Sequence, residues 1–493
     1  MWEKVKEYTK KNKFLVNPFL VLFVIYFVGM LAIILASVNY ADDIGRTERG
    51  YAGWAYFSRY ISEIGGRIIH ADNYLTNIAP LPQILSAVVL AISSVMLLVV
   101  VCGKEKFKQP WIKWILQVIA AIPLGLSPYM LECLSYQYDS IYMAMSVFFA
   151  VLPLLFYNRD TKWFVISMIV GVLGICTTYQ PAIGIIPMLI VFLAIRDWND
   201  KKKFLKKCVV GVLVFLVTLF VFQKFLMIPQ DGYVSNGLPA LGNLIPETIE
   251  HLKQYFVYVW TDFKLIWTAV IAVMVLLFIV YFSYISKRNK ALAAGVSVIG
   301  VICMAVAIFT IYSLLDKPLY TTRAMYGVGA FIAVIGVYIV GMPKSWVAKI
   351  PVFIICWCFF VFAFTYGNAL KVQDEYRNNK INMVVADLNS LPIMQDETTK
   401  TIQATGGVGL SPIITHMPQN YQMLNRLLEP SFEKGIIWDT YRLVYLCDVG
   451  NLTADLNVDL TKEALPVLKS TAYYDIKGTE DKILVVFKEN HRD

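Results

Sequence analysis

Long apolar stretches separated by short polar loops dominate the first 366 residues of the chain. Eleven of these stretches come close to the ~20 residues that a helix needs to cross a bilayer. The pattern therefore predicts an all-α polytopic membrane protein with eleven transmembrane helices, at residues 14–37, 83–102, 111–126, 141–157, 163–177, 181–195, 209–225, 265–285, 291–315, 324–340 and 350–366. The stretches that begin at Trp111, Trp163 and Pro181 are short, so they could be broken or re-entrant helices that line a cavity.

The remaining residues, 367–493, are polar and mixed in character. Their apolar pieces GIIWDTYRLVYLC and KILVVF read as strands, and ~120 residues suffice for one small domain. The piece ATGGVGLSP, from Ala404, lacks the full GxGxxG spacing and is read as an ordinary strand and turn. We expect a small mixed α/β domain after a transmembrane module of residues 1–366.

Basic residues gather in alternate loops along the transmembrane module. Short loops rich in lysine and arginine stay in the cytoplasm, so we expect the N-terminus inside the cell and the C-terminal domain outside it. The other loops expected outside are 38–82, 127–140, 178–180, 226–264 and 316–323. The residues behind this orientation are Lys4, Lys6, Lys10, Lys11 and Lys13, followed by basic groups at 104–108, 159–162, 196–207, 287–290 and 344–349.

Composition narrows the class of protein. Of the residues, 58% are hydrophobic and 16% are charged, with a mean hydropathy of +0.59, whereas soluble proteins carry roughly 25% charged residues. The net charge of +9 resides in the short basic loops, which favours a bilayer as partner and argues against nucleic acid. The eight cysteines form no CxxC pair, which supports neither a zinc site nor a disulfide framework. The expected location is the plasma membrane.

The first outer loop, residues 38–82, carries four arginines and no lysine. Arginine is better suited than lysine to bidentate binding of phosphate or carboxylate. The arginines could therefore hold an anionic headgroup, or they could pair with acids of the same loop. The arginines are Arg46, Arg49, Arg59 and Arg67, and the acids are Asp42, Asp43, Glu48 and Glu63.

An amphipathic helix is expected at residues 53–70 of this loop. Its apolar residues fall three and four positions apart, as on one face of a helix, and its charged residues lie four apart on the opposite face. Such a helix could lie in the plane of the outer leaflet or pack on the other spans. The apolar stripe is Trp54, Phe57, Ile61, Ile64 and Ile68, and the charged face is Arg59, Glu63 and Arg67.

Asp42 and Asp43 stand side by side where the first span emerges. Low dielectric and like charge both raise the pKa of a carboxyl group, which suits a general base. The pair could instead bind a divalent cation such as Mg²⁺ or Mn²⁺, which prefers carboxylate oxygens, or it could be the solvated end of a helix.

Three more outer loops carry side chains suited to sugars. Acids and amides bind hydroxyl groups, and aromatic rings pack on sugar faces, although aromatic residues also gather at membrane interfaces for their own reasons. The candidates for substrate binding are Glu132, Tyr138, Asp139, Tyr179, Gln180, Lys317 and Arg323.

The stretch NYADDIGRTERGYAGWAYFSRY resembles the first outer loop of the bacterial glucosyltransferase family of the serotype-converting type. SPYMLECLSYQYDS is similar to the second loop of that family, and IAPLPQIL, TTYQPAIG, TTRAMYG and FAFTYGNALKVQ are similar to shorter patches. The resemblance is strongest before Ser140 and weak in the C-terminal domain. Asp42 and Asp43 match the acidic pair of the family, and Arg46 and Arg59 match its arginines. Ser58 stands where that family more often has glycine.

The resemblance implies a GT-C-like enzyme whose active site lies at the outer face. The implied donor is a polyprenyl-phosphate-linked sugar, glucose or a related hexose, and the implied acceptor is a surface polysaccharide such as an O-antigen or a cell-wall glycan. No cofactor is required by the resemblance, because many GT-C enzymes work without metal. Monomer and oligomer both stay open.

The residues and the resemblance together suggest an inverting single displacement. One of Asp42 and Asp43 would remove the proton of the acceptor hydroxyl, and arginines, among them Arg46, Arg59 and Arg323, would stabilise the departing lipid phosphate. A flippase or transporter of lipid-linked sugars would use similar loops but would need polar residues along a path through the membrane. A polysaccharide polymerase or ligase is the other alternative.

Overall fold

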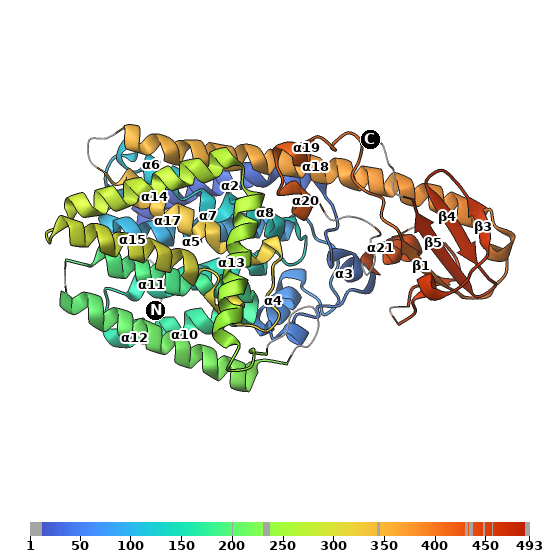
Figure 1. The fold of residues 1–493 in the computed structure, drawn as a ribbon, viewed down its shortest axis with the longest axis horizontal. Helices are drawn as coiled ribbons and strands as arrows, with labels where there is room; N and C mark the ends of the chain where they lie inside the picture. Colours follow the sequence, from blue (N-terminus) through green and yellow to red (C-terminus); the bar gives the residue numbers. More distant parts are fainter. Residues whose placement is uncertain are drawn as a thin grey trace.

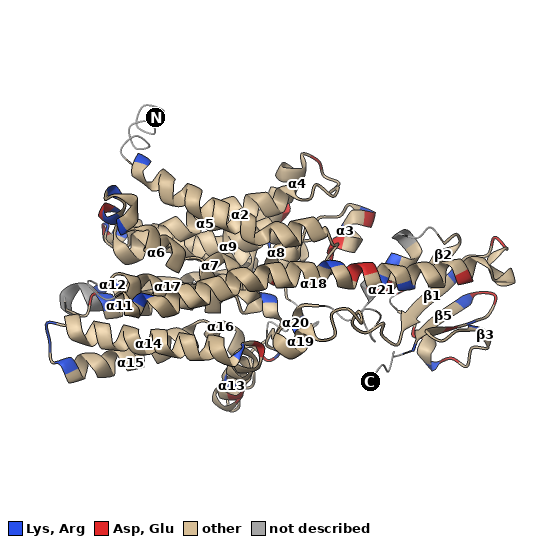
Figure 2. Ribbon diagram, turned by 90° about the horizontal axis from the view of Figure 1, so that it is seen from above, with Lys and Arg blue, Asp and Glu red and all other residues tan. Residues whose placement is uncertain are grey.

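Helices form most of the chain, and a small sheet lies at one end of the molecule (Figure 1). The computed structural model describes residues 12–199, 201–229, 237–342, 346–428, 432, 437–446, 449–455 and 457–488. Of the lysines used for orientation, Lys4, Lys6, Lys10, Lys11 and Lys344 lie outside these residues. The described basic loops gather at the end of the helical bundle that is far from the sheet (Figure 2).

All eleven expected spans are helical, but the count of eleven is not confirmed. Within the described residues, seven helices are long and apolar enough to cross a membrane, or eight if one bent pair is a single span. The seven contain α2 (Val16–Ala36), α5 (Leu81–Cys102), α10 (Thr161–Thr178), α12 (Lys201–Val221), α14 (Leu265–Ile285), α15 (Lys290–Ala307) and α18 (Ile350–Asn389). The chain is thus a multi-pass membrane protein.

Of the stretches expected to be broken or re-entrant, the one after Trp111 leads into a bend just beyond its expected end, whereas the one after Trp163 is the unbroken α10. The first part of this bent pair is α6 (Ile115–Ala120) with α7 (Pro123–Leu126), and α8 (Pro128–Ser135) follows at an angle of 57°. Proline at 123 and at 128 removes a backbone donor from each junction. Three apolar helical segments are shorter than a full span. The segment Ser140–Phe156 contains α9 (Ser140–Val151), and Gln180–Arg196 contains α11 (Ile185–Arg196). The third segment is α17 (Gly327–Val340).

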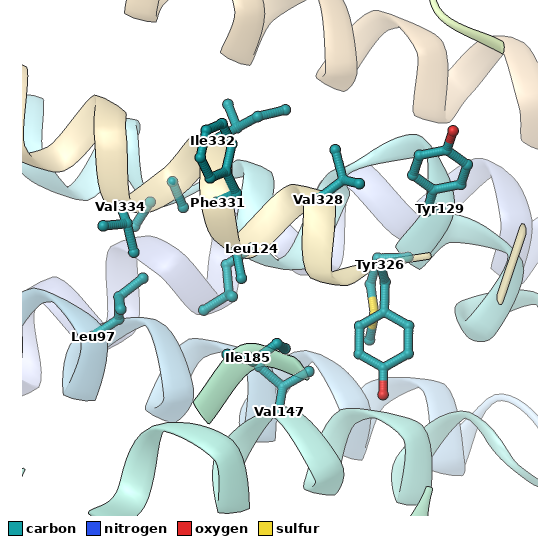
Figure 3. Packing of buried hydrophobic residues seen from close by; sticks show 14 of the residues in the cluster. Leu97, Leu124, Tyr129, Val147, Ile185, Tyr326, Val328, Phe331, Ile332 and Val334 are labelled. Carbon is teal, nitrogen blue, oxygen red and sulfur yellow. The ribbon is translucent and has the colours of Figure 1, made fainter. Parts of the chain in front are cut away.

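Short helices are tolerated here because protein surrounds them. Helix α17 is buried along almost its whole length. Its side chains, among them Val328 and Val334, pack between α5, α7, α9 and α11 (Figure 3). Close backbone approach also tightens the bundle: a Cβ added at Gly367 of α18 would stand 2.6 Å from Ala32 of α2, the small-residue contact common between membrane helices.

The C-terminal sheet has five strands in the order β2-β1-β5-β4-β3. Strand β1 (Lys400–Thr405) is parallel to β2 (Leu452–Thr453) and to β5 (Lys482–Phe487), while β4 (Tyr474–Gly478) is antiparallel to β5 and to β3 (Val467–Ser470). The prediction that KILVVF is a strand is confirmed. ATGGVGLSP is the end of β1 and a turn, in which Gly406, Gly407 and Gly409 have positive φ.

The strand predicted for GIIWDTYRLVYLC is wrong. The described part of this piece is α21 (Ile437–Tyr441), followed by a wider helical turn at Arg442–Leu446. Leu443 and Val444 are buried against the sheet core, so the apolar residues fit a buried helix turn as well as they fit a strand. Short apolar runs do not distinguish the two by themselves.

Helix α18 joins the bundle to the sheet without interruption. It is 40 residues long and passes through the expected domain boundary at residue 366. Its last turns, with Ile381 and Val384, pack on the sheet. The chain after β1 returns to the bundle through α19 (Met417–Asn420) and α20 (Leu424–Leu427), where Met423 and Leu424 join the bundle core.

Candidate active site

Asp43 connects the first outer loop to the second through hydrogen bonds. It opens α3 (Asp43–Arg49), where a carboxylate suits the positive end of the helix, and it is fully buried. Its Oδ2 accepts hydrogen bonds from the backbone N–H groups of Tyr40, at 3.1 Å, and Gln137, at 2.8 Å, and its Oδ1 from that of Tyr138, at 3.4 Å. Burial raises the pKa of Asp43 to about 8, although these donors oppose the shift.

We expect the free energy of unfolding to fall as pH rises from about 4 to about 8, because of Asp43. Its carboxyl has an ordinary pKa of 3.8 when unfolded and a pKa of about 8 when folded. Between these values the folded protein holds a proton that the unfolded chain has released, so rising pH favours unfolding. Asp43→Asn cannot ionise and should flatten this slope. Unfolding temperatures of both proteins in detergent, across this pH range, would test it; equal slopes would contradict the prediction.

Asp42 differs from its neighbour in its surroundings. It is half-buried, and none of the described residues donates a hydrogen bond to its carboxylate. Its charge lies close enough to Arg46 to help raise the pKa of that guanidinium. Tyr40, two residues earlier, lines the largest cavity of the site described below, and two residues of chain span at most about 7 Å. Of the two acids, Asp42 is the one whose carboxylate accepts no hydrogen bond from the described residues, although it does not itself line the cavity.

The Mg²⁺ or Mn²⁺ ion considered for this pair does not fit the geometry. Both oxygens of Asp43 face backbone N–H groups, which repel a cation. No group of three acids, histidines or cysteines gathers anywhere in the described part of the chain in a way that could hold a metal.

Arg46 and Asp139 form a buried pair that joins the same two loops. Their side chains approach to 2.6 Å, and the guanidinium carbon lies 4.7 Å from the ring centre of Trp54. The indole N–H of Trp54 donates to Asp139, and the hydroxyl of Tyr138 lies 3.2 Å from that of Thr47. Since removing one partner of a buried ion pair is costly, this cluster holds the loops in place. Arg46 was expected either to hold an anionic headgroup or to pair with an acid of its own loop. It pairs with an acid, but this acid, Asp139, belongs to the second loop.

Arg59 joins the first loop to the third. Its Nε donates to Oε1 of Gln180 at 3.0 Å, and its guanidinium lies over the ring of Tyr179 at 4.7 Å. The preceding Ser58 has φ +61°, the left-handed region that favours glycine, as the family resemblance anticipates. The Ser58 hydroxyl accepts a hydrogen bond from the backbone N–H of Ile228 at 2.8 Å.

The amphipathic helix is shorter than the predicted 53–70. A turn at Ala55–Phe57 and the left-handed Ser58 precede α4 (Tyr60–His70), and Trp54 is buried away from the stripe. Ser62 and Gly66 form the packed face of α4, and a Cβ at Gly66 would come within 2.4 Å of Trp54. On the opposite face of α4, the side chains of Ile64 and Ile68 are 61% and 72% exposed. The helix is packed against the bundle and still presents apolar side chains outward.

A cavity of about 450 Å³ lies where the second outer loop, α13 (Leu244–Asp262), the loop before α17 and the C-terminal domain meet. Arg323 reaches Oε1 of Glu132 at 3.3 Å and the hydroxyl of Tyr136 at 2.6 Å, and Thr322 donates to the other oxygen of Glu132. The lining residues are Tyr40, Glu132, Tyr258, Pro318, Leu319, Tyr320, Thr321, Thr322, Arg323 and Arg426.

Arg426 brings a second guanidinium into this cavity, and sequence reasoning missed it. It pairs with Asp262, donates to the carbonyl of Tyr320, and lies over the ring of Tyr258 at 4.3 Å. The available signal was a single arginine within MLNRLL of the C-terminal domain, a piece whose other residues, apart from Asn425, are apolar. Because the C-terminal domain was expected to be separate from the transmembrane module, the sequence did not indicate that Arg426 lies beside the transmembrane helices.

The sequence candidates thus fall into three groups rather than one site. Glu132 and Arg323 line the cavity. Asp43, Arg46, Tyr138 and Asp139 connect the first two loops, and Arg59, Tyr179 and Gln180 connect the first to the third. Arg49 pairs with Glu48 and lies over the ring of Tyr441 at 5.0 Å, and Lys317 is exposed beside Pro318 of the cavity wall. Neither of these last two lines the cavity.

Comparison with known proteins adds independent findings. The family model described as "Glucosyl transferase GtrII" matches residues 7–334. A Salmonella phage P22 protein, described as an "Uncharacterized 55.3 kDa protein in gtrB 5'region", is 21% identical over 449 residues, which cover 88% of this chain and 90% of that protein. No solved structure matches the chain. The family match includes Asp42, Asp43 and Arg323 and ends before Arg426.

Proposed function

Because the chain belongs to the GtrII glucosyl transferase family, we propose that it transfers glucose from a polyprenyl phosphate to a surface polysaccharide outside the cell. It is a multi-pass membrane glycosyltransferase, and a lipid-linked donor explains why the candidate site adjoins the membrane helices. The observation that carries the proposal is the cavity beside Tyr40, in which Arg323 and Arg426 meet Glu132 and several tyrosines. Guanidinium groups suit a phosphate, while the acid and the rings suit a sugar.

The orientation of the proposed reaction follows from charge. The basic loops lie at the end of the bundle far from the sheet (Figure 2), and such loops belong in the cytoplasm. The cavity and the C-terminal domain then face the outside of the plasma membrane. A donor whose lipid tail stays in the outer leaflet can present its sugar phosphate there.

The proposed chemistry is a single displacement with Asp42 as base. The acceptor hydroxyl oxygen attacks the anomeric carbon of the glucose, and its proton passes to the carboxylate of Asp42. The bond from the anomeric carbon to the phosphate oxygen breaks, and its electron pair leaves with the lipid phosphate. Arg323 and Arg426 stabilise that charge, while Asp43, held by backbone donors, positions the segment that carries Asp42.

The test uses the full chain in liposomes with polyprenyl-phosphate [¹⁴C]glucose and surface polysaccharide from cells that lack the encoding gene. We expect radiolabel to move to the polysaccharide, with the anomeric configuration inverted by NMR. Movement of the lipid-linked sugar across the bilayer without transfer would overturn the proposal in favour of a flippase. Elongation of the polysaccharide backbone would indicate a polymerase instead.

A further inference from the structure

A second cavity, of about 340 Å³, lies beside the first. It is formed by the end of α13, the start of α14 and the chain around α19 and α20, which lie together at the sheet end of the bundle (Figure 2). The lining residues are Trp260, Asp262, Phe263, Lys264, Leu265, Thr268, Gln419, Asn420 and Gln422.

The lining of this second cavity suits a neutral sugar better than a phosphate. Gln419, Asn420 and Gln422 are exposed, and their side-chain amides form no hydrogen bond with any described residue. Each amide offers both donors and an acceptor, as sugar hydroxyls require. The indole of Trp260 is 64% exposed and offers a face on which a sugar ring can pack.

Charge separates the two cavities. The first contains two guanidinium groups, whereas the single cation in the lining of the second is Lys264, whose ammonium lies 4.2 Å from the ring centre of Tyr421. An anionic ligand therefore fits the first cavity, and an uncharged polyol fits the second.

One ion pair connects the linings of the two cavities. Asp262 lines the second cavity, and Arg426, its partner, lines the first. The same helix, α13, contributes Tyr258 to the first and Trp260 to the second. An acceptor chain that lies along the end of α13 would place one unit in the second cavity and the next unit beside the sugar phosphate in the first.

We propose that the second cavity binds a neutral sugar unit of the acceptor glycan, adjacent to the unit that receives the glucose. This inference rests on the proposed function and adds to it a place for the acceptor. The inference also gives the C-terminal domain a role in acceptor binding, because this domain supplies the three side-chain amides.

The kinetic test compares Trp260→Ala and the double variant Gln419→Ala/Asn420→Ala with the unsubstituted chain in the liposome assay. We expect the KM for the polysaccharide to rise about tenfold, as loss of one ring face or two hydrogen bonds would give. The KM for polyprenyl-phosphate glucose and kcat should not change. Trp260→Phe, which keeps an aromatic ring, should restore most of the affinity.

Trp111→Ala is the matched control, because Trp111 is 63% exposed and lies among the basic loops at the opposite end of the bundle. It should leave both KM values unchanged. A rise in the KM of the donor for Trp260→Ala would overturn the inference and assign the cavity to the lipid-linked sugar. An unchanged KM for the polysaccharide in both variants would overturn it too.

A direct measurement of polysaccharide binding tests this inference independently of the proposed function. Fluorescently labelled polysaccharide, released from cells that lack the encoding gene, is titrated against the purified full chain without donor. Binding that is weakened by Trp260→Ala supports the inference even if no glucose is transferred, in which case only the proposed function fails. Binding that is unaffected by Trp260→Ala, or no binding, overturns the inference whatever the transfer assay shows.

Discussion

Asp42→Asn is expected to lower kcat for glucose transfer by about 10²–10⁴-fold, the contribution typical of a positioned general base. The amide has nearly the same size as the carboxylate but cannot accept the proton of the acceptor hydroxyl. No described residue donates a hydrogen bond to the side chain of Asp42, so the unfolding temperature should change little. The measurement is the initial rate of glucose transfer at saturating donor and acceptor, together with the unfolding temperature in detergent.

Two further variants make the assignment of the base specific. Asp72→Asn changes an exposed acid of the same outer loop and should leave kcat unchanged. Asp43→Asn should alter stability and its pH dependence more than it alters kcat. If Asp42→Asn kept the normal rate while Asp43→Asn lost it, the roles of the two acids would have to be exchanged.

Arg323→Ala is expected to lower kcat by about 10²–10³-fold, the loss seen when one group that stabilises a developing anion is removed. Arg323 lines the cavity, and its guanidinium lies beside Glu132 and Tyr136. Arg323→Lys should recover only part of the rate, because an ammonium group cannot bind a phosphate through two parallel hydrogen bonds. Rates and the KM for polyprenyl-phosphate glucose are measured for both variants.

The control for Arg323 is Arg67→Ala. Arg67 is an exposed arginine of the first outer loop, paired with Glu63 at 3.0 Å within α4, and exposed pairs of this kind contribute little stability. Its loss should leave transfer unchanged. Normal transfer by Arg323→Ala, in protein with an unchanged unfolding temperature, would remove Arg323 from the proposed mechanism.

Apolar periodicity located the long membrane helices and the last strand, although it did not give the number of spans. The runs within α2, α5 and α14 are long and uninterrupted, so burial in lipid or in the bundle requires a helix whatever the tertiary context. The strand predicted around Leu443 was wrong because a short apolar piece fits a strand and a buried helix turn equally well. The stripe assigned to Trp54 failed for a related reason: the left-handed Ser58 breaks the helix and sends the indole inward.

Pairings between distant segments could not be predicted from one sequence. Arg46 and Asp139 are recognisable as charges in two outer loops, but nothing in either loop says that they meet at 2.6 Å. Arg426 is the clearer case, since it reaches Asp262 only because the chain returns from the sheet to the bundle. The candidate residue types were visible in the sequence, whereas their division into one cavity and two connecting clusters depends on tertiary packing.

The uninterrupted length of α18 has a consequence for the substrate. Forty residues of helix extend roughly 60 Å, about twice the ~30 Å thickness of the hydrocarbon layer. If the basic loops lie in the cytoplasm, as proposed, one half of α18 spans the lipid and the other half carries the sheet beyond the headgroups (Figure 2). Under the proposed function, a glycan that reaches the two cavities would then approach from beside the outer half of α18 rather than along its axis.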